Sequence, residues 1–141
     1  MLPVRETLYV GKGSEIAICT LGSMDLLRQI SRSALMDRIC IAGRLLSENA
    51  GIDQMLRSAQ AQRDLRTLIV CGREVQGHMP GQALVSLFQN GIDKDGRIIG
   101  AEGHRPVLSM ERSEVKEIVE RIELVDLIGE VDYETIARSV P

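Results

Sequence analysis

Short apolar segments alternate with segments of helical periodicity along this chain, and this alternation constrains the fold more than any other feature. Buried strands are predicted at four apolar segments, residues 15–20, 39–42, 65–71 and 122–128. Amphipathic helices are predicted between and after them, at residues 24–35, 49–62, 80–90, 111–121 and 133–140. Strands that alternate with helices pair in parallel, because each helix carries the chain back to the start of the next strand. The pattern therefore predicts a single α/β domain over residues 1–141, with a mostly parallel sheet and helices on both faces.

Composition narrows the classes of function. Aromatic residues make up 2% of the 141 residues and hydrophobic residues 44%, so the core is aliphatic. A net charge of −3 and the scarcity of rings that could stack on bases argue against nucleic acid as a partner. The chain contains no apolar run long enough to span a membrane, and residues 1–10 lack the apolar stretch of a signal peptide. Three cysteines without a CxxC pair predict buried, reduced thiols in a cytoplasmic protein.

Ligands of doubly wound sheets bind in the crevice beyond the carboxyl ends of the strands. If residues 97–99 form a further short strand, the segments that directly follow strands are 21–23, 43–49, 72–80 and 100–106. All four contain glycine or small polar residues. Candidate binding residues are therefore expected in these segments.

The loop CGREVQGHMPGQ, residues 71–82, holds three glycines around a single histidine, His78. Glycine lets a large flat ligand approach the main chain closely. A neutral imidazole can bind a metal through one nitrogen if an acceptor holds the other nitrogen, and we expect Glu74, Gln82 or a backbone carbonyl in that role. The alternative is a polar surface histidine, which is the commoner case for a lone histidine in a loop.

Other motifs are weaker. The glycine-rich segment 11–13 precedes the first of the four predicted buried strands instead of following it, so a plain turn is favoured over a phosphate site. Residues 93–96 begin like a calcium loop, but His104 stands where the closing glutamate would be. Cys71, His78 and His104 fit no spacing of zinc ligands.

Several longer motifs resemble those of one protein family. They are AICTLGS (17–23), IAG followed by SEN and GID (41–53), LIVCGREVQGHMPGQALVSLFQNGID (68–93), GRIIGAEG (96–103) and ELVDLIG (123–129). Taken in this order, they look like the corrinoid-carrying A subunit of tetrahydromethanopterin S-methyltransferase, over nearly the whole chain.

The resemblance implies a Rossmann-like domain that binds cobalamin or a related corrinoid, with His78 as the lower axial ligand of cobalt. In the family, a methyl group passes from an N5-methyl-tetrahydropterin to cobalt and then to a thiol such as coenzyme M. The A subunit is the carrier, and other methyltransferase subunits, including a methyl-tetrahydropterin:corrinoid methyltransferase, carry out the transfers. Relatives in methanogens are membrane-anchored, whereas this sequence has no span of its own.

The resemblance also implies the residues that would line the corrinoid site. They are Leu21, Gly22, Ser23, Ser47, Glu48, Asn49, Gly72, Glu74, Val75, Gly77, His78, Met79, Gly81, Gln82, Gly100, Ala101, Glu102 and Gly103. For residues 47–49, a simple helix cap is the alternative, since Asn49 is a good N-cap. For the glycines, the alternative is plain turns. Two further interpretations of the whole chain stay open: a relative that has lost the corrinoid and serves as an interaction or regulatory domain, and a nucleotide-binding protein.

Gln76 departs from the pattern of methionine-synthase-type corrinoid domains. Those domains carry the signature DxHxxG, and Gln76 occupies the position of its aspartate. Another group must therefore hold and polarise the imidazole of His78.

Overall fold

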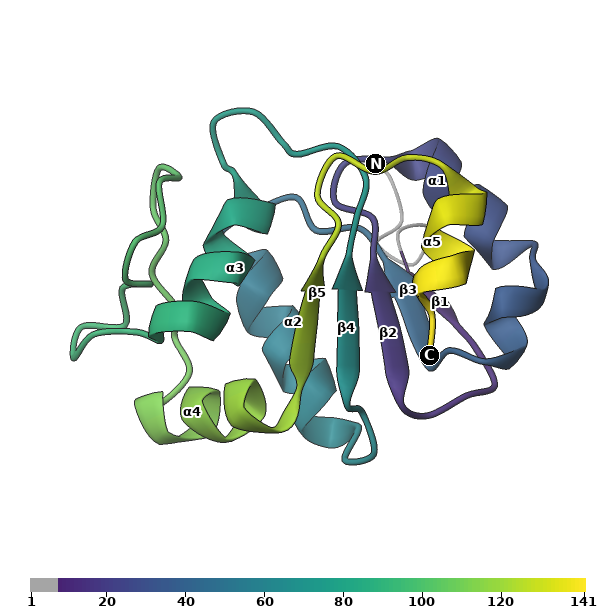
Figure 1. Ribbon diagram of the computed structural model, residues 1–141. Coiled ribbons are helices and arrows are strands. Elements are labelled where there is room, and N and C mark those ends of the chain that lie inside the picture. Colours follow the sequence, from purple (N-terminus) through teal and green to yellow (C-terminus); the bar gives the residue numbers. More distant parts are fainter. Residues whose placement is uncertain (1–7) are drawn as a thin grey trace.

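Within residues 8–141, which the computed structural model describes, five strands form one sheet between two layers of helices (Figure 1). Residues 1–7, most of the segment considered above for a signal peptide, lie outside the described residues. The strands are β1 (Leu8–Val10), β2 (Ile16–Cys19), β3 (Ile41–Gly43), β4 (Thr67–Val70) and β5 (Glu123–Asp126). The helices are α1 (Met24–Ser31), α2 (Ala50–Ala61), α3 (Pro80–Asn90), α4 (Arg112–Arg121) and α5 (Tyr133–Ser139), with a 3₁₀ helix η2 at Ala34–Asp37.

The sheet has the order β1-β3-β2-β4-β5. β3, β2, β4 and β5 are parallel, and β1 pairs antiparallel with β3 at one edge. The predicted fold class, an α/β domain with a mostly parallel sheet, is confirmed. The chain leaves β2 for β3 on one side and later returns to β4 on the other side, so the strand order reverses between β2 and β4. A crevice opens at such a point beyond the carboxyl ends of the strands.

Two aliphatic cores cover the two faces of the sheet. In β2, Ala17 and Cys19 face the core beneath α2, α3 and α4, whereas Ile16 and Ile18 face the core beneath α1 and α5. This alternation follows from the two-residue period of a strand. Both faces of β2 and β4 are buried, which is why these strands read as continuous apolar runs in the sequence. Among the described helices, none is long and apolar enough to cross a membrane.

The structure corrects three predicted elements. β1 is an additional strand that the sequence pattern does not predict, because three residues at a sheet edge, two of them exposed, are too few to show a hydrophobic period. The helix predicted at 24–35 ends at Ser31, and the Ser33 hydroxyl accepts a hydrogen bond from the Leu35 N–H and caps η2 instead. Residues 97–99 form only isolated bridges, Ile92 with Ile98 and Arg97 with Val107, and do not join the sheet.

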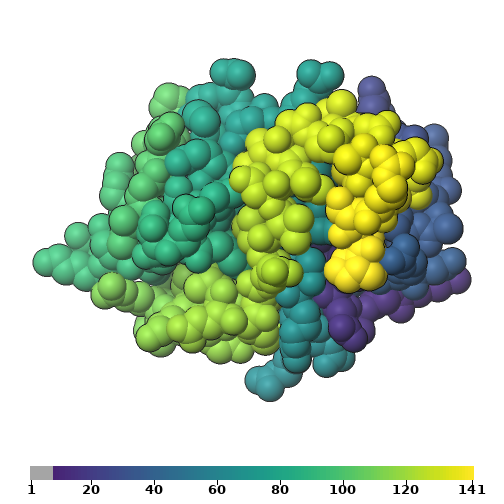
Figure 2. All heavy atoms as spheres, viewed as in Figure 1, coloured from purple at the N-terminus to yellow at the C-terminus, as the bar shows by residue number. Residues whose placement is uncertain are grey.

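The segment between α3 and α4, residues 91–111, is therefore an excursion from the body of the domain rather than a sheet element. Its green atoms protrude at one side of the molecule in Figure 2. Ile92, Ile98 and Leu108 anchor it in the core beneath α3. The Asp53 carboxylate of α2 accepts hydrogen bonds from the backbone N–H of Ser109. These bonds hold the C-terminal end of the segment against α2.

Candidate functional site

The loops that follow β2 and β4 are joined by backbone contacts where the strand order reverses. Gly72 has a φ of +78°, and a Cβ at this position would collide with the carbonyl oxygen of Thr20. The Gly22 N–H donates to the Arg73 carbonyl oxygen at 3.0 Å, and the Arg73 N–H donates to the Ser23 hydroxyl at 2.8 Å. The two loops are therefore held together as one unit at the carboxyl edge of the sheet.

Glu74 is committed to the start of α3. Its carboxylate accepts hydrogen bonds from the N–H groups of Gly81 at 3.0 Å and Gln82 at 2.8 Å. The N-cap residue Met79 makes no side-chain cap and has a left-handed φ of +48°. Because the first N–H groups of a helix lack partners within it, an anion placed here stabilises the helix. Glu74 is therefore not the acceptor for His78 that the sequence allowed, and Gln82 is not either.

The acceptor for His78 is Glu48, from the loop that follows β3. His78 Nδ1 lies 3.1 Å from Glu48 Oε1. The Glu48 side chain is 1% exposed, whereas the His78 side chain is 53% exposed. A carboxylate only accepts hydrogen bonds, so Nδ1 carries the hydrogen and the neutral ring keeps its lone pair on Nε2. A buried anion thus holds a half-exposed imidazole whose second nitrogen is available.

Backbone groups help to keep Glu48 ionised. Burial works against the charged form, but the N–H groups of Glu48 and Arg105 and the His78 imidazole together hold the pKa of the Glu48 carboxyl below its ordinary value. The Arg105 N–H donates to Glu48 Oε2 at 3.1 Å. Both carboxylate oxygens therefore have a donor, as a buried charge requires.

The excursion brings residues 100–105 to the same site, although no sheet strand precedes them. Gln82 Nε2 donates to the Gly100 carbonyl oxygen at 3.0 Å, and the Glu102 N–H donates to Gln82 Oε1 at 2.9 Å. A Cβ on Gly103 would collide with the His78 carbonyl oxygen and crowd Glu48. The sequence pattern places this segment at the site because it would follow a strand at residues 97–99, and that reason is wrong. Hydrogen bonds to Gln82 of α3 hold the segment there instead.

The two imidazoles of the chain are neighbours. The ring of His104 packs edge-on against that of His78, with 5.7 Å between ring centroids. It also lies 3.1 Å from the position of a Cβ on Gly77, which has a φ of +79°. His104 is exposed and is a site neighbour that the sequence did not predict.

Residues 47–49 serve as a helix cap and as part of the site. Asn49 Oδ1 accepts from the Ala50 N–H, and its Nδ2 donates to the Arg105 carbonyl oxygen at 3.0 Å. The Ser47 hydroxyl accepts from the Gly51 N–H at 2.7 Å. The predicted cap is confirmed, and the same turn points Glu48 toward His78.

Not every predicted site residue faces the crevice. Leu21 is fully buried despite a left-handed φ of +51°, and it packs into the core beneath α3. Val75 is half-buried and accepts a hydrogen bond from the Met79 N–H. Gly81 has no room for a side chain, since Leu21, Glu74 and Ile128 surround it. The residues around His78 that the structure brings together are Glu48, Asn49, Gly77, Gly103, His104 and Arg105.

The cysteines take no part in this cluster. All three are buried and free. Burial raises the pKa of the Cys19 thiol to about 12, so the thiol stays neutral. Within residues 8–141, no three side chains of histidine, cysteine, aspartate or glutamate gather as ligands of one metal ion.

Comparisons with known proteins agree with one another. The family model that describes the A subunit of tetrahydromethanopterin S-methyltransferase matches residues 4–141. A protein of Methanothermobacter thermautotrophicus, named as A subunit number 2 of tetrahydromethanopterin S-methyltransferase, is 36% identical over 129 residues, which cover 90% of this chain and 68% of that protein. The A subunit of the Methanocaldococcus jannaschii enzyme is 36% identical over 142 residues, covering 98% of this chain and 57% of that protein.

A third relative, the A subunit of the Methanopyrus kandleri enzyme, is 39% identical over 109 residues, covering 75% of this chain and 43% of that protein. This chain thus spans between 43% and 68% of the length of these three relatives. The matched portion includes the whole described domain, because the family model spans residues 4–141.

Proposed function

This chain belongs to the family formed by the A subunits of tetrahydromethanopterin S-methyltransferase, and from this premise we propose that it carries a corrinoid in methyl transfer, with His78 Nε2 as the lower ligand of cobalt. When bound, a corrinoid supplies a cobalt atom that takes a methyl group from an N5-methyl-tetrahydropterin and gives it to a thiol of the coenzyme M type. The other subunits that carry out the two transfers are its proposed partners.

The pairing of Glu48 with His78 supports this proposal most. A metal-binding histidine needs one nitrogen free and the other held by an acceptor, which fixes the tautomer and raises the basicity of the ligand. Glu48 supplies that acceptor at 3.1 Å. It takes the role of the aspartate that Gln76 replaces, although it comes from a different loop.

The surroundings of His78 fit a large flat ring. Gly77 precedes His78, and Gly103 lies against the backbone of His78. Gly72 packs against the backbone of Thr20 in the neighbouring loop. A Cβ at these three glycines would meet Thr20, His104 or the His78 backbone, so glycine lets the loops pack closely around His78. The imidazole of His78 is half-exposed, so a ligand broader than the histidine itself can reach it.

Each residue has a separate task in this proposal. His78 binds the metal, and Glu48 is a positioning residue that holds the Nδ1 hydrogen. Glu74 fixes the start of α3 and with it the end of the loop that carries His78. Gln82 ties residues 100–102 to α3, so that the loops around His78 keep one arrangement.

The test is a visible-light titration of the purified protein with hydroxocobalamin. We expect saturable binding by the wild type and by His104→Ala, which removes the neighbouring imidazole as a matched control. In His78→Ala, the spectral signature of imidazole coordination should be lost. The protein with the corrinoid reduced to cobalt(II) is then studied by electron paramagnetic resonance. Uniform nitrogen-15 labelling of the protein should change the superhyperfine splitting from the axial nitrogen, because that nitrogen belongs to His78.

Absence of binding by the folded wild type would refute the carrier role and leave an interaction domain. Binding with an axial nitrogen that does not respond to labelling of the protein would retain the corrinoid but remove His78 as its ligand.

A further inference from the structure

Two buried polar side-chain atoms have no hydrogen-bond partner among residues 8–141. They are the hydroxyl oxygen of Thr20 and the Nε of Arg44. Thr20 is fully buried, and Arg44 is half-buried. A buried polar group without a partner is unfavourable, and native proteins contain few of them. Both atoms therefore mark a place where a polar group from outside the chain would be stabilised.

Thr20 and Arg44 are neighbours at the carboxyl edge of the sheet. They directly follow β2 and β3, and the parallel pairing of these strands continues through them. The Thr20 N–H donates to the Gly43 carbonyl oxygen at 2.8 Å. One step further, the Leu45 N–H donates to the Leu21 carbonyl oxygen at 3.2 Å. The two side chains therefore start from adjacent positions on neighbouring strands.

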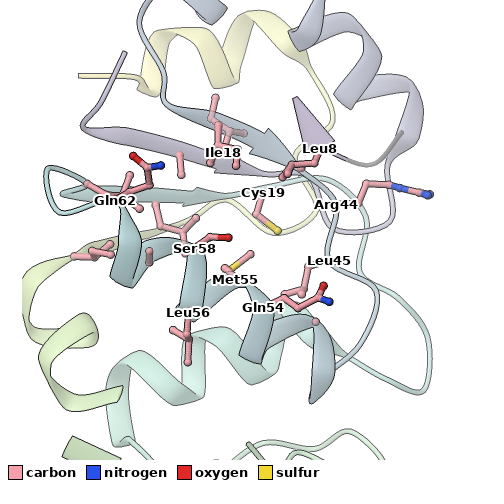
Figure 3. A pocket seen from close by; sticks show the side chains of 18 of the residues that line it. Leu8, Ile18, Cys19, Arg44, Leu45, Gln54, Met55, Leu56, Ser58 and Gln62 are labelled. Carbon is pink, nitrogen blue, oxygen red and sulfur yellow. The ribbon is translucent and has the colours of Figure 1, made fainter. Parts of the chain in front are cut away.

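Both side chains lie on the face of the sheet that α1 and α5 cover. Cys19, Leu21 and Leu45, which flank them in the chain, belong to the core beneath α2, α3 and α4. Because successive side chains of a strand point to opposite faces, Thr20 and Arg44 face α1. Figure 3 shows the Arg44 side chain pointing away from the cavity between α2 and the sheet.

The start of α1 lies at the same place. The Ser23 N–H donates to the Thr20 carbonyl oxygen at 2.9 Å, so α1 begins one turn after Thr20. The Ser23 hydroxyl accepts from the Arg73 N–H at 2.8 Å and makes no cap for the helix. The first N–H groups of a helix lack partners within it and favour an anion. At α3 the Glu74 carboxylate is that anion, whereas the N-cap of α1 supplies none.

The start of α1 is also accessible from solvent. Residues 22–24 are half-buried, and the side chain of Asp25 in the first turn is fully exposed. The Asp25 carboxylate pairs with Arg28, one turn further along α1, at 3.6 Å. An anion from solution can therefore approach the start of the helix.

We propose that Thr20, Arg44 and the start of α1 bind a phosphate group, either free phosphate or the end of a phosphomonoester. A guanidinium group binds two phosphate oxygens at once through parallel hydrogen bonds. The N–H groups at the start of α1 and the Thr20 hydroxyl then face the remaining oxygens. Donors on three sides suit a tetrahedral anion better than a flat carboxylate, which offers two oxygens. The site depends neither on His78 nor on the proposed corrinoid.

The test is thermal unfolding in increasing concentrations of inorganic phosphate, with sodium chloride of equal ionic strength as the reference. Phosphate should raise the melting temperature of the wild type, because a ligand that binds only the folded state stabilises it. Arg44→Met should weaken the phosphate affinity about tenfold or more, since charge-assisted hydrogen bonds are lost. Arg63→Met removes the same charge from an exposed position between α2 and β4, at the opposite edge of the sheet, and should leave the affinity within about twofold.

Thr20→Val separates a binding role of the hydroxyl from a structural one. Without phosphate, the melting temperature of this variant should equal or exceed that of the wild type, because the hydroxyl it removes has no partner. In phosphate, its affinity should fall about threefold or more. If Arg44→Met fails to fold, Thr20→Val decides, and an affinity equal to that of the wild type would overturn the site.

Amide signals of the nitrogen-15-labelled protein locate the anion. Phosphate should shift the backbone N–H signals of residues 22–26 before others, and glycerol 3-phosphate, the phosphomonoester probe, should shift the same signals. Tighter binding of glycerol 3-phosphate than of phosphate would assign the site to a phosphomonoester, and equal or weaker binding would assign it to free phosphate. The proposal is overturned if phosphate stabilises the wild type no more than chloride does, or if it stabilises Arg44→Met as much as the wild type.

Discussion

The Glu48→Gln substitution gives the most direct test of the site geometry. It keeps the shape of the side chain and removes its charge. Glu48 accepts from the Arg105 N–H at 3.1 Å and from His78 Nδ1 at 3.1 Å. The amide of glutamine can accept only one of these bonds through its oxygen, and its NH₂ then faces the other donor. The substitution therefore breaks one bond of a side chain that is 1% exposed.

The size of the effect follows from burial. A hydrogen bond to a charged group contributes about 1.5–3 kcal/mol, and a buried donor left unpaired costs about 1–3 kcal/mol. We expect Glu48→Gln to lower the free energy of unfolding by about 2–3 kcal/mol at neutral pH. For a domain of this size, that corresponds to a fall in melting temperature of roughly 6–12 °C. Because His78 is half-exposed, its coupling with Glu48 should be smaller, about 1 kcal/mol.

The effect should depend on pH in a defined direction. The folded state lowers the pKa of Glu48 below its ordinary value. A carboxyl of this kind contributes stability above the unfolded pKa, about 4.3, and loses it as the pH falls through the folded pKa. The difference in stability between wild type and Glu48→Gln should therefore be full near pH 7 and shrink below about pH 4.

The assay is urea unfolding of the wild type, Glu48→Gln, His78→Ala and the double variant, at pH 7 and at pH 3.5. A double-mutant cycle isolates the coupling of the pair. The pairing of Glu48 with His78 is refuted if the two substitutions add within about 0.3–0.5 kcal/mol at pH 7. A pH-independent effect of Glu48→Gln would show that Glu48 is not ionised in the folded protein.

Three further outcomes can be checked by unfolding and labelling. Gly72→Ala should cost more than about 3 kcal/mol, since it adds a collision with the Thr20 backbone to the strain of a positive φ. Gly91 has a φ of +74° and a ψ of −160° with open space around it, so Gly91→Ala adds backbone strain alone and should cost about 1–3 kcal/mol. Equal costs for both substitutions would contradict the contact of Gly72 with the β2 loop. Glu74→Ala should lower the free energy of unfolding by about 1–2 kcal/mol, because two N–H groups of α3 lose their acceptor, and no change in urea midpoint would argue against this cap. The three buried thiols should react with a thiol reagent at pH 8 only as fast as the protein unfolds, and rapid labelling of the native protein would contradict their burial.

Local signals account for the parts of the fold that the sequence predicts well. α3 spans Pro80–Asn90 as predicted, because Pro80 favours a first helical turn and Gly91 favours a helix end. β2 and β4 lie inside the predicted apolar runs, since both of their faces are buried. In contrast, β1 depends on pairing with β3, which no local pattern reveals.

The candidate site is harder to predict, because its key contact joins distant segments. Glu48 and His78 are 30 residues apart and lie on loops that follow different strands. The sequence pattern predicts both residues at the carboxyl edge of the sheet, yet it offers Glu74, Gln82 or a backbone carbonyl as the partner of His78. Spacing along the chain does not show which of several carboxylates is buried next to an imidazole.

The division of labour between the two glutamates follows from how each is held. Glu74 stands seven residues before Gly81, and the loop folds back so that its two oxygens meet the first N–H groups of α3. A carboxylate tied to these donors and to the Val75 N–H has little capacity left for an imidazole. Glu48 enters from the opposite side of the crevice, and although its own N–H and that of Arg105 bond to its carboxylate, Oε1 lies within reach of His78 Nδ1. The tautomer of His78 is therefore set across the crevice, by the loop after β3, and a change in how residues 103–105 hold Glu48 would reach the proposed metal ligand directly.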